Sequence, residues 1–205
     1  MTCRAGRRIC VAMAHVNVEI KAACEYPGPI RRVLRARDAD FRGADRQVDT
    51  YFRVPRGRLK LREGRLENHL IHYDRPDLAG PRRADVLLLE TPPGERTERL
   101  KEVLTRALGV LVVVDKRREI YFIDNVKFHI DEVEHLGGFV EIEAQSAGDE
   151  VPEETLLAQC SEYLCLFGIR REDLVAESYS DLLLKRRGRP GTPGTSAPGG
   201  LPSRP

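Results

Sequence analysis

The stretch VKFHIDEVEHLGGFVEIEA, residues 126–144, decides how this chain folds. From Val126 to Asp131 apolar residues alternate with polar ones, and the same alternation returns after Gly137-Gly138. Successive side chains of a strand point to opposite faces of the sheet. The two-residue period therefore predicts two strands, each with one apolar and one polar face, separated by a glycine break.

Outside this stretch, six further runs are alternating, β-branched or aromatic and are bounded by turn-forming residues. The predicted strands are 15–22, 46–52, 58–63, 68–75, 84–90, 110–123, 126–134 and 138–144. The run 110–123 is long enough to be two strands bent near Arg117. The predicted helices are 29–38, 94–108, 152–168 and 179–185. Eight or nine antiparallel strands with few helices predict an α+β fold built on a closed or nearly closed β-barrel.

The chain has 205 residues, a length typical of one domain. All predicted strands lie within 15–184, which we take as the domain. The tail 185–205, KRRGRPGTPGTSAPGGLPSRP, has almost no apolar side chain and is predicted to be disordered. The N-terminus 1–14 is basic without an acid, and we expect it to be disordered or to resemble a targeting segment.

Composition excludes several classes of protein. Charged residues make up 32% of the chain but nearly cancel, to a net charge of +2. This balance, with an aromatic content of 6%, argues against a nucleic-acid-binding protein. No apolar run approaches the ~20 residues of a membrane span, so we expect no membrane partner. Five cysteines without a CxxC pair favour a cytoplasmic location, with mitochondria as the alternative, and a homodimer stays open.

The polar faces of the predicted strands are charged and largely sorted by sign. Cations share one face at 58, 60 and 62 and another at 116 and 118, whereas glutamates share a face at 141 and 143. An antiparallel sheet with one wet face shows similar alternation. However, like charges two residues apart repel one another unless a polyanion lies across them. Turned inward, these faces would suit a polyphosphate with a divalent metal ion.

These residues resemble the CYTH superfamily, the triphosphate-tunnel fold of class IV adenylyl cyclases and of thiamine or inorganic triphosphatases. The matching motifs, in chain order, are NVEIK (17–21), QVDTYF (47–52), RLKLRE (58–63), YDRPD (73–77), the Lys116, Arg118 and Tyr121 group, HIDEVEHLGGFVEIE (129–143) and SYSDLL (178–183). Three of them, QVDTYF, GGFVEIE and SYSDLL, are most similar to the class IV cyclase branch. The resemblance implies an eight-stranded antiparallel barrel, with flanking helices, around a polar tunnel.

The resemblance also implies a divalent-metal-dependent enzyme that converts ATP to cyclic AMP and pyrophosphate. The alternative is a triphosphatase that hydrolyses thiamine triphosphate or inorganic triphosphate. The implied phosphate-binding residues are Lys21, Arg58, Lys60, Arg62, Arg75, Lys116 and Arg118. The implied ligands of Mg²⁺ or Mn²⁺ are Glu19, Glu141, Glu143 and Asn17. The implied catalytic residues are Asp131 and Lys21.

The chain departs from the family pattern at two positions. Asn17 stands where the first glutamate of an ExExK signature is expected, which removes one negative charge from the metal site. A module that binds a triphosphate or polyphosphate without catalysis is therefore a third hypothesis. Gly138 replaces an aspartate expected in the turn.

Four polar residues on the strands receive structural interpretations. We assign structural hydrogen bonding to Gln47 and Asp49, and a surface or strand-end position to His69. For His129 a phosphate contact and a structural role both stay open.

Overall fold

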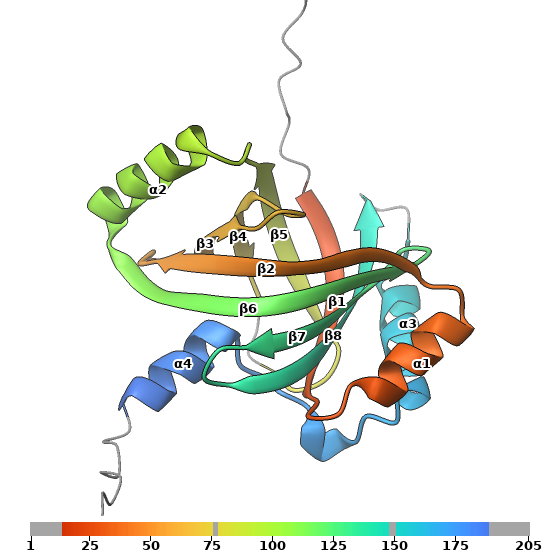
Figure 1. Cartoon of the computed structure of the whole chain (residues 1–205). Helices are drawn as coiled ribbons and strands as arrows, with labels where there is room; N and C mark the ends of the chain where they lie inside the picture. The colour runs from red at the N-terminus through yellow and green to blue at the C-terminus, as the bar shows by residue number, and fades with distance from the viewer. Residues whose placement is uncertain (1–13, 76–77, 148–150, 189–205) are drawn as a thin grey trace, which may run out of the picture.

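The computed structural model describes residues 14–75, 78–147 and 151–188. Within them, eight strands form a closed antiparallel barrel in the order β1-β5-β4-β3-β2-β6-β7-β8, as Figure 1 shows. The strands are β1 (Ala14–Ala23), β2 (Asp40–Phe52), β3 (Arg58–Glu63), β4 (His69–Asp74), β5 (Arg82–Glu90), β6 (Val110–Ile123), β7 (Val126–Val133) and β8 (Gly137–Ala147). The helices are α1 (Gly28–Ala36), α2 (Glu95–Leu108), α3 (Glu153–Leu166), α4 (Tyr179–Gly188) and a 3₁₀ turn, Arg171–Asp173.

The predicted strands and helices are all present, with differences at their ends. The run 110–123 is one continuous strand, because β6 pairs with β2 on one side and β7 on the other. Strand β2 begins at Asp40, well before its predicted start, because a register shift at Gly43, whose φ is +126°, continues the pairing through an irregular segment.

The ends of the predicted domain also differ slightly from the structure. Helix α4 continues to Gly188, so the first residues assigned to the disordered tail are helical. Residues 1–13 and 189–205, which hold most of the predicted N-terminus and tail, lie outside the described residues. None of the helices in the described part of the chain is long and apolar enough to cross a membrane.

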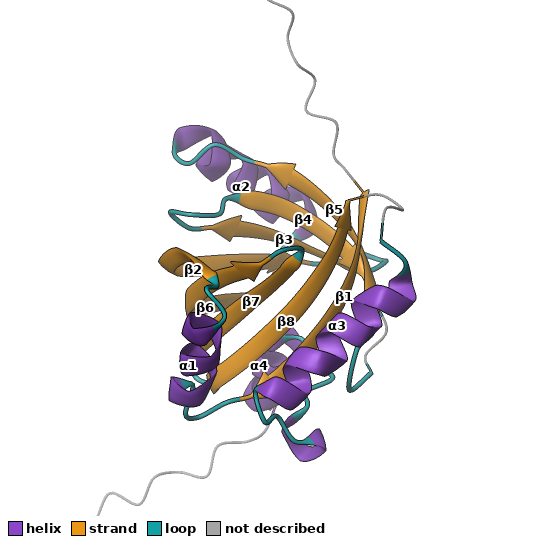
Figure 2. Ribbon diagram, turned by 90° about the vertical axis from the view of Figure 1, so that its right-hand side faces the viewer, coloured by secondary structure: helices purple, strands orange, loops and turns teal. Residues whose placement is uncertain are grey.

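The outward apolar faces of β1, β7 and β8 form the main hydrophobic core. Helices α1 and α3 cover these faces, and Figure 2 shows α3 lying along β8 and β1. Phe128 of β7 is fully buried and meets the ring of Tyr163 of α3 edge-on, with centroids 4.6 Å apart. Since these apolar faces point outward to helices, their charged counterparts point into the barrel.

A second apolar cluster fills part of the barrel interior beside α4. It combines inward side chains of six strands with two residues of α4, namely Tyr51, Ile71, Tyr73, Val112, Val114, Val133, Phe139, Tyr179 and Leu183. Burying a large apolar side chain contributes about 1.5–3 kcal/mol, so this cluster fixes α4 against the barrel. The barrel interior is therefore apolar beside α4 and polar elsewhere.

The turn between β7 and β8 explains the glycine at 138. The backbone N–H of Cys24 donates to the carbonyl oxygen of Gly138 at 2.9 Å, just beyond the end of β1. A Cβ atom at position 138 would lie 2.2 Å from the carbonyl oxygen of Cys24. An aspartate does not fit here without moving the backbone, so the departure from the family pattern has a steric cause.

Candidate functional site

A cavity of about 350 Å³ lies inside the barrel and is lined by side chains from all eight strands. Seven lysine or arginine residues and six carboxylates line it among the described residues. The cations are Lys21, Lys60, Arg62, Arg75, Lys116, Arg118 and Lys127, and the acids are Glu19, Asp49, Glu67, Glu90, Glu141 and Glu143. The charged faces therefore point inward, as predicted.

Three of the cations surround a single buried carboxylate, and we call Asp49 with Lys60, Arg62 and Lys116 the Asp49 hub. Lys60 and Lys116 each donate to Oδ2 of Asp49, at 3.1 and 2.7 Å. Arg62 binds both carboxylate oxygens, at 2.9 and 3.1 Å. Burial by itself raises the pKa of Asp49, but the three cations outweigh burial and hold this pKa well below its ordinary value.

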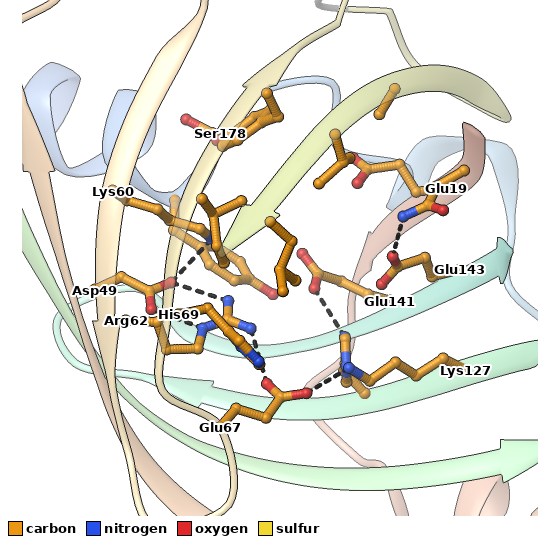
Figure 3. A pocket seen from close by; sticks show the side chains of 18 of the residues that line it. Glu19, Asp49, Lys60, Arg62, Glu67, His69, Lys127, Glu141, Glu143 and Ser178 are labelled. Carbon is orange, nitrogen blue, oxygen red and sulfur yellow. Dashed lines mark hydrogen bonds and ion pairs between the residues drawn. The ribbon is translucent and has the colours of Figure 1, made fainter. Parts of the chain in front are cut away.

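Glu67 extends this network from the loop between β3 and β4. Its carboxylate accepts hydrogen bonds from Arg62 at 2.9 Å and from Lys127 at 2.5 Å. Asp45 fixes the loop by accepting two of its backbone N–H groups. Figure 3 shows Asp49, Arg62, Glu67 and Lys127 as one chain of contacts along the cavity wall.

On the opposite side of the barrel, Glu19, Glu141 and Glu143 of β1 and β8 form what we call the glutamate cluster. Glu19 pairs directly with Glu143 in the strand register. Arg75 and Arg82 both donate to Oε1 of Glu19, Arg82 at 3.0 and 3.2 Å. Burial raises the pKa of Glu19; Arg75 opposes this rise, whereas Glu141 and Glu143 add to it. Like charges directly opposite one another destabilise a sheet unless a cation lies between them.

Glu141 is more strongly compensated than Glu19. Its Oε1 lies 3.3 Å from Nζ of Lys21, and its Oε2 accepts hydrogen bonds from Arg118 at 2.6 Å and from Nδ1 of His129 at 3.3 Å. Burial raises the pKa of Glu141, but Arg118 and Lys21 outweigh it and hold this pKa well below its ordinary value. Glu141 is therefore ionised at neutral pH.

Two buried atoms beside the glutamate cluster lack a hydrogen-bond partner among the described residues. One is Oδ1 of Asn17, whose Nδ2 donates to Glu143 at 2.5 Å. The other is Nε2 of His129. Burial, reinforced by Arg118, lowers the pKa of His129 to about 4, so the ring is neutral. Because Nδ1 faces the carboxylate of Glu141 and carries the hydrogen, Nε2 is left as an acceptor.

The donor set around the glutamate cluster suits a hard divalent cation. It consists of carboxylate oxygens and the unpartnered amide oxygen of Asn17, the ligand types that Mg²⁺ and Mn²⁺ prefer. The described residues contain no group of three His, Cys, Asp or Glu already arranged to hold a metal ion. The residues therefore fit such an ion by their chemistry, although their present contacts are with arginine, lysine and amide groups.

Two residues expected in the tunnel do not line the cavity among the described residues. Arg58 lies on the same strand face as Lys60, but its guanidinium contacts Asp181 of α4 at 2.8 Å. Asp131 lies behind the wall and binds Arg118 through both carboxylate oxygens. It also accepts the hydroxyl group of Tyr179 at 2.8 Å. The other predicted site residues, Asn17, Glu19, Lys21, Lys60, Arg62, Arg75, Lys116, Arg118, Glu141 and Glu143, all line the cavity.

Several functional residues were missed by sequence analysis. Lys127 shares a strand face with His129, and that shared face is a signal that could have revealed it. His69, expected at the surface, lines the cavity instead. Glu67 lies in a loop and Arg82 at a strand end, where alternation gives no signal. Arg82 is 1% exposed and reaches both Glu19 and three backbone carbonyl groups.

Strands β4 and β5 give the cavity an apolar wall. Ile71 of β4 and Ala84, Val86 and Leu88 of β5 line the cavity between its charged sides. A purely inorganic ligand gains nothing from such a surface, whereas an organic group buries apolar area there.

The family model of the CYTH domain matches residues 15–179. No curated protein sequence matches the chain. Many solved structures do match it. A protein of Pyrococcus horikoshii OT3 is 26% identical, with a TM-score of 0.69 over 81% of this chain and 98% of that one.

Two further structures carry names that describe an activity. One is a protein of Vibrio parahaemolyticus proposed to be an adenylate cyclase, 16% identical with a TM-score of 0.65, covering 82% of this chain and 97% of that one. The other is a Hippeastrum protein proposed to be an adenylyl cyclase but with a dominant triphosphatase activity; it is 18% identical with a TM-score of 0.53, covering 86% and 98%. At these identities the likeness concerns the fold. With the match of the family model over most of its length, the chain belongs to the CYTH domain family.

Proposed function

We propose that this protein is a divalent-metal-dependent enzyme that acts on an organic triphosphate. The observation that carries the proposal is the convergence of seven lysine and arginine side chains on one enclosed cavity that also holds the glutamate cluster. Charge-assisted hydrogen bonds from lysine and arginine are strong ligands for phosphate oxygens. Carboxylates in the same cavity supply what a metal bound to the phosphates requires.

The cations have distinct positions relative to a bound triphosphate. Lys60, Arg62 and Lys116 approach from β2's side of the barrel, whereas Lys21 and Arg75 approach from the side of β1. A phosphate chain between them receives donors from both sides. Because phosphoryl and nucleotidyl transfer depend chiefly on positioning and charge neutralisation, these cations would stabilise the departing phosphate groups.

The metal would be Mg²⁺ or Mn²⁺, held by Glu19, Glu141 and Glu143 with help from Oδ1 of Asn17. When bound, it supplies Lewis-acid polarisation of phosphate oxygens. Asp131, which holds both Arg118 and Tyr179, acts here as a positioning residue. This assignment replaces the direct catalytic role expected for Asp131, because its carboxylate lies behind Arg118.

The apolar wall of β4 and β5 favours a nucleotide over inorganic triphosphate. In the cyclase reaction, the ribose 3′-hydroxyl oxygen bonds to the α-phosphorus of ATP, the bond from that phosphorus to the bridging oxygen breaks, and pyrophosphate leaves. Nε2 of His129 is a neutral acceptor facing this cavity, and we assign it the hydrogen bond from the attacking hydroxyl group.

A triphosphatase is the second candidate, because the same cavity accommodates water as the nucleophile. Water then attacks the terminal phosphorus, and orthophosphate and a diphosphate are released. The Hippeastrum structure, named for a dominant triphosphatase activity, keeps this candidate open for a chain of the same fold.

The test is incubation of the purified protein with ATP, thiamine triphosphate or inorganic triphosphate, each with Mg²⁺, Mn²⁺ or EDTA. We expect cyclic AMP and pyrophosphate from ATP, and no product with EDTA. Release of orthophosphate instead identifies the triphosphatase. Tight, metal-dependent binding without any product identifies a binding module, and no binding of any triphosphate contradicts the proposal.

Glu141→Gln is the matched variant, because the amide keeps the shape of the side chain and removes its charge. We expect it to abolish the dependence of turnover on metal. Full metal-dependent activity in this variant would remove Glu141 from the ligand set.

A further inference from the structure

The side chains that would hold the phosphates are already bonded to the carboxylates that would hold the metal. This arrangement concerns the glutamate cluster and its partners on β1, β4 and β6, and it bears on the order in which ligands enter the cavity. The argument rests on the proposed function, since it takes metal and triphosphate as the two ligands.

Glu19 is engaged by two guanidinium groups. Arg75, which is 8% exposed and lines the cavity, donates to Oε1 of Glu19. Arg82 donates to the same oxygen through Nε and Nη2. A divalent cation approaching Glu19 therefore meets two positive charges before it reaches the carboxylate.

Glu141 is engaged in the same manner. Lys21 lies 3.3 Å from its Oε1, and Arg118 donates to its Oε2 at 2.6 Å. Lys21 is 4% exposed, and besides Glu141 it contacts the carbonyl oxygen of Glu177 at 3.2 Å. Both carboxylates are thus neutralised from within the protein.

Glu143 differs because its printed donors are uncharged. It accepts hydrogen bonds from the amides of Asn17 and Gln145, at 2.5 and 3.1 Å. The amide oxygen of Asn17 beside it is 95% or more buried with its residue and has no partner among the described residues. An unsatisfied buried acceptor is costly, so this oxygen marks a place where a donor or a cation is expected.

We propose that the cavity takes up its divalent cation together with the triphosphate, because Arg75, Lys21 and Arg118 neutralise the glutamate cluster until phosphate oxygens take over these cations. A triphosphate offers the arginine and lysine groups a new set of anionic partners. The released carboxylates then face the phosphate chain and Oδ1 of Asn17. Binding of metal and of triphosphate is mutually favourable, and by linkage each tightens the other by the same factor.

The Asp49 hub supplies a matched control. Lys60 is a cavity cation like Lys21 and Arg75, but it pairs with Asp49 on the opposite side of the barrel. Removing its charge lowers the total positive charge of the cavity equally, yet leaves the contacts of the glutamate cluster in place. A comparison of these variants separates partner exchange from a general effect of charge.

The experiment measures Mn²⁺ binding to metal-free protein, without any phosphate, by the electron paramagnetic resonance signal of free Mn²⁺. Arg75→Met and Lys21→Met each keep a long apolar stem and remove the charge. We expect each to bind Mn²⁺ at least tenfold more tightly than the unmodified protein, and Lys60→Met to stay within twofold of it. Thermal melts verify that each variant is folded, and glutamine replaces methionine where a variant fails to melt cooperatively.

Two results overturn the inference: unchanged Mn²⁺ affinity in the folded Arg75 and Lys21 variants, or an equal gain in Lys60→Met. Calorimetry of inorganic triphosphate and ATP with the unmodified protein, with and without Mn²⁺, tests the proposed function separately. If no triphosphate binds in either condition, the proposed function fails. If triphosphate binds but the variants show no gain in Mn²⁺ affinity, only this inference fails.

Discussion

Two groups of carboxylates face one another across the same cavity and differ in how they are compensated. Asp49 is 2% exposed and contacts three cations from β3 and β6. Glu19 is 28% exposed, contacts two arginines and lies opposite another glutamate. Both are surrounded by the same kinds of residue, yet the pKa of Asp49 lies well below its ordinary value and that of Glu19 lies above its own.

The difference shows that the number of positive charges in a cavity does not decide the role of an acid within it. At Asp49 the cations outnumber the acid, so its charge is fixed and it holds Lys60, Arg62 and Lys116 in place. At Glu19 burial and two neighbouring glutamates outweigh Arg75, so its negative charge is incompletely compensated. We interpret Asp49 as a permanent counter-ion and the glutamate cluster as the part of the cavity able to accept a cation.

The largest effect is expected from replacing the acid of the Asp49 hub by its amide. Asp49→Asn leaves three cations without their counter-ion, two of them fully buried. Removing one partner of a buried ion pair costs about 3–5 kcal/mol. We expect the free energy of unfolding, measured by urea denaturation at pH 7, to fall by about this amount.

Glu19→Gln is the matched change on the other side of the cavity. Since burial already favours the neutral form of Glu19, we expect a loss of less than about 1 kcal/mol. Equal losses in Asp49→Asn and Glu19→Gln would show that the two acids have the same structural role, contrary to the comparison.

The next largest effect concerns Lys60, which belongs to the Asp49 hub but is 12% exposed to the cavity. We expect Lys60→Ala to weaken triphosphate binding by more than tenfold, about 1.4 kcal/mol or more, because it removes one charge-assisted contact. Calorimetry measures the affinity, and a thermal melt verifies that the variant is folded. Unchanged affinity would place the phosphate chain on the side of the glutamate cluster alone.

The fold follows from the sequence because strand alternation is a local signal. The charged faces at 58–62 and 141–143 and their apolar counterparts determine which side of each strand points inward, and the structure has both as predicted. The end of β2 was not predictable in this way. Its first residues contain Gly43 in a bulge, where pairing with β6 outweighs weak local preference.

The site was predictable where its residues lie on regular strands, as Lys21, Lys60 and Arg118 do. It was not predictable where partners come from elsewhere in the chain. Alternation gave Asp49 a face but could not reveal that three cations would converge on it. Glu67, supplied by a loop, and Tyr179, supplied by α4, reach the cavity region only through the tertiary fold.

A smaller effect is expected from the pH dependence of Lys116. Burial lowers its pKa to about 7, although Asp49 opposes the shift. Because its folded-state pKa lies below the ordinary 10.5, Lys116 of the free protein loses its charge as pH rises through 7. We expect triphosphate affinity to fall several-fold between pH 7 and pH 8. Lys116→Arg, which stays charged throughout this range, should abolish this fall; the same pH profile in the variant would assign the titration elsewhere.

The smallest effect is expected at Arg58, which sequence analysis placed in the tunnel. Its guanidinium contacts Asp181, which also accepts the hydroxyl group of Ser178 at the start of α4. Arg58→Met should therefore change triphosphate affinity by less than twofold, in contrast to Lys60→Ala two residues along the same strand face. Because α4 carries Tyr179 and Leu183 into the apolar cluster, we expect a modest fall in melting temperature instead. A tenfold loss of affinity at unchanged melting temperature would return Arg58 to the phosphate-binding wall and extend that wall to the end of the barrel beside α4.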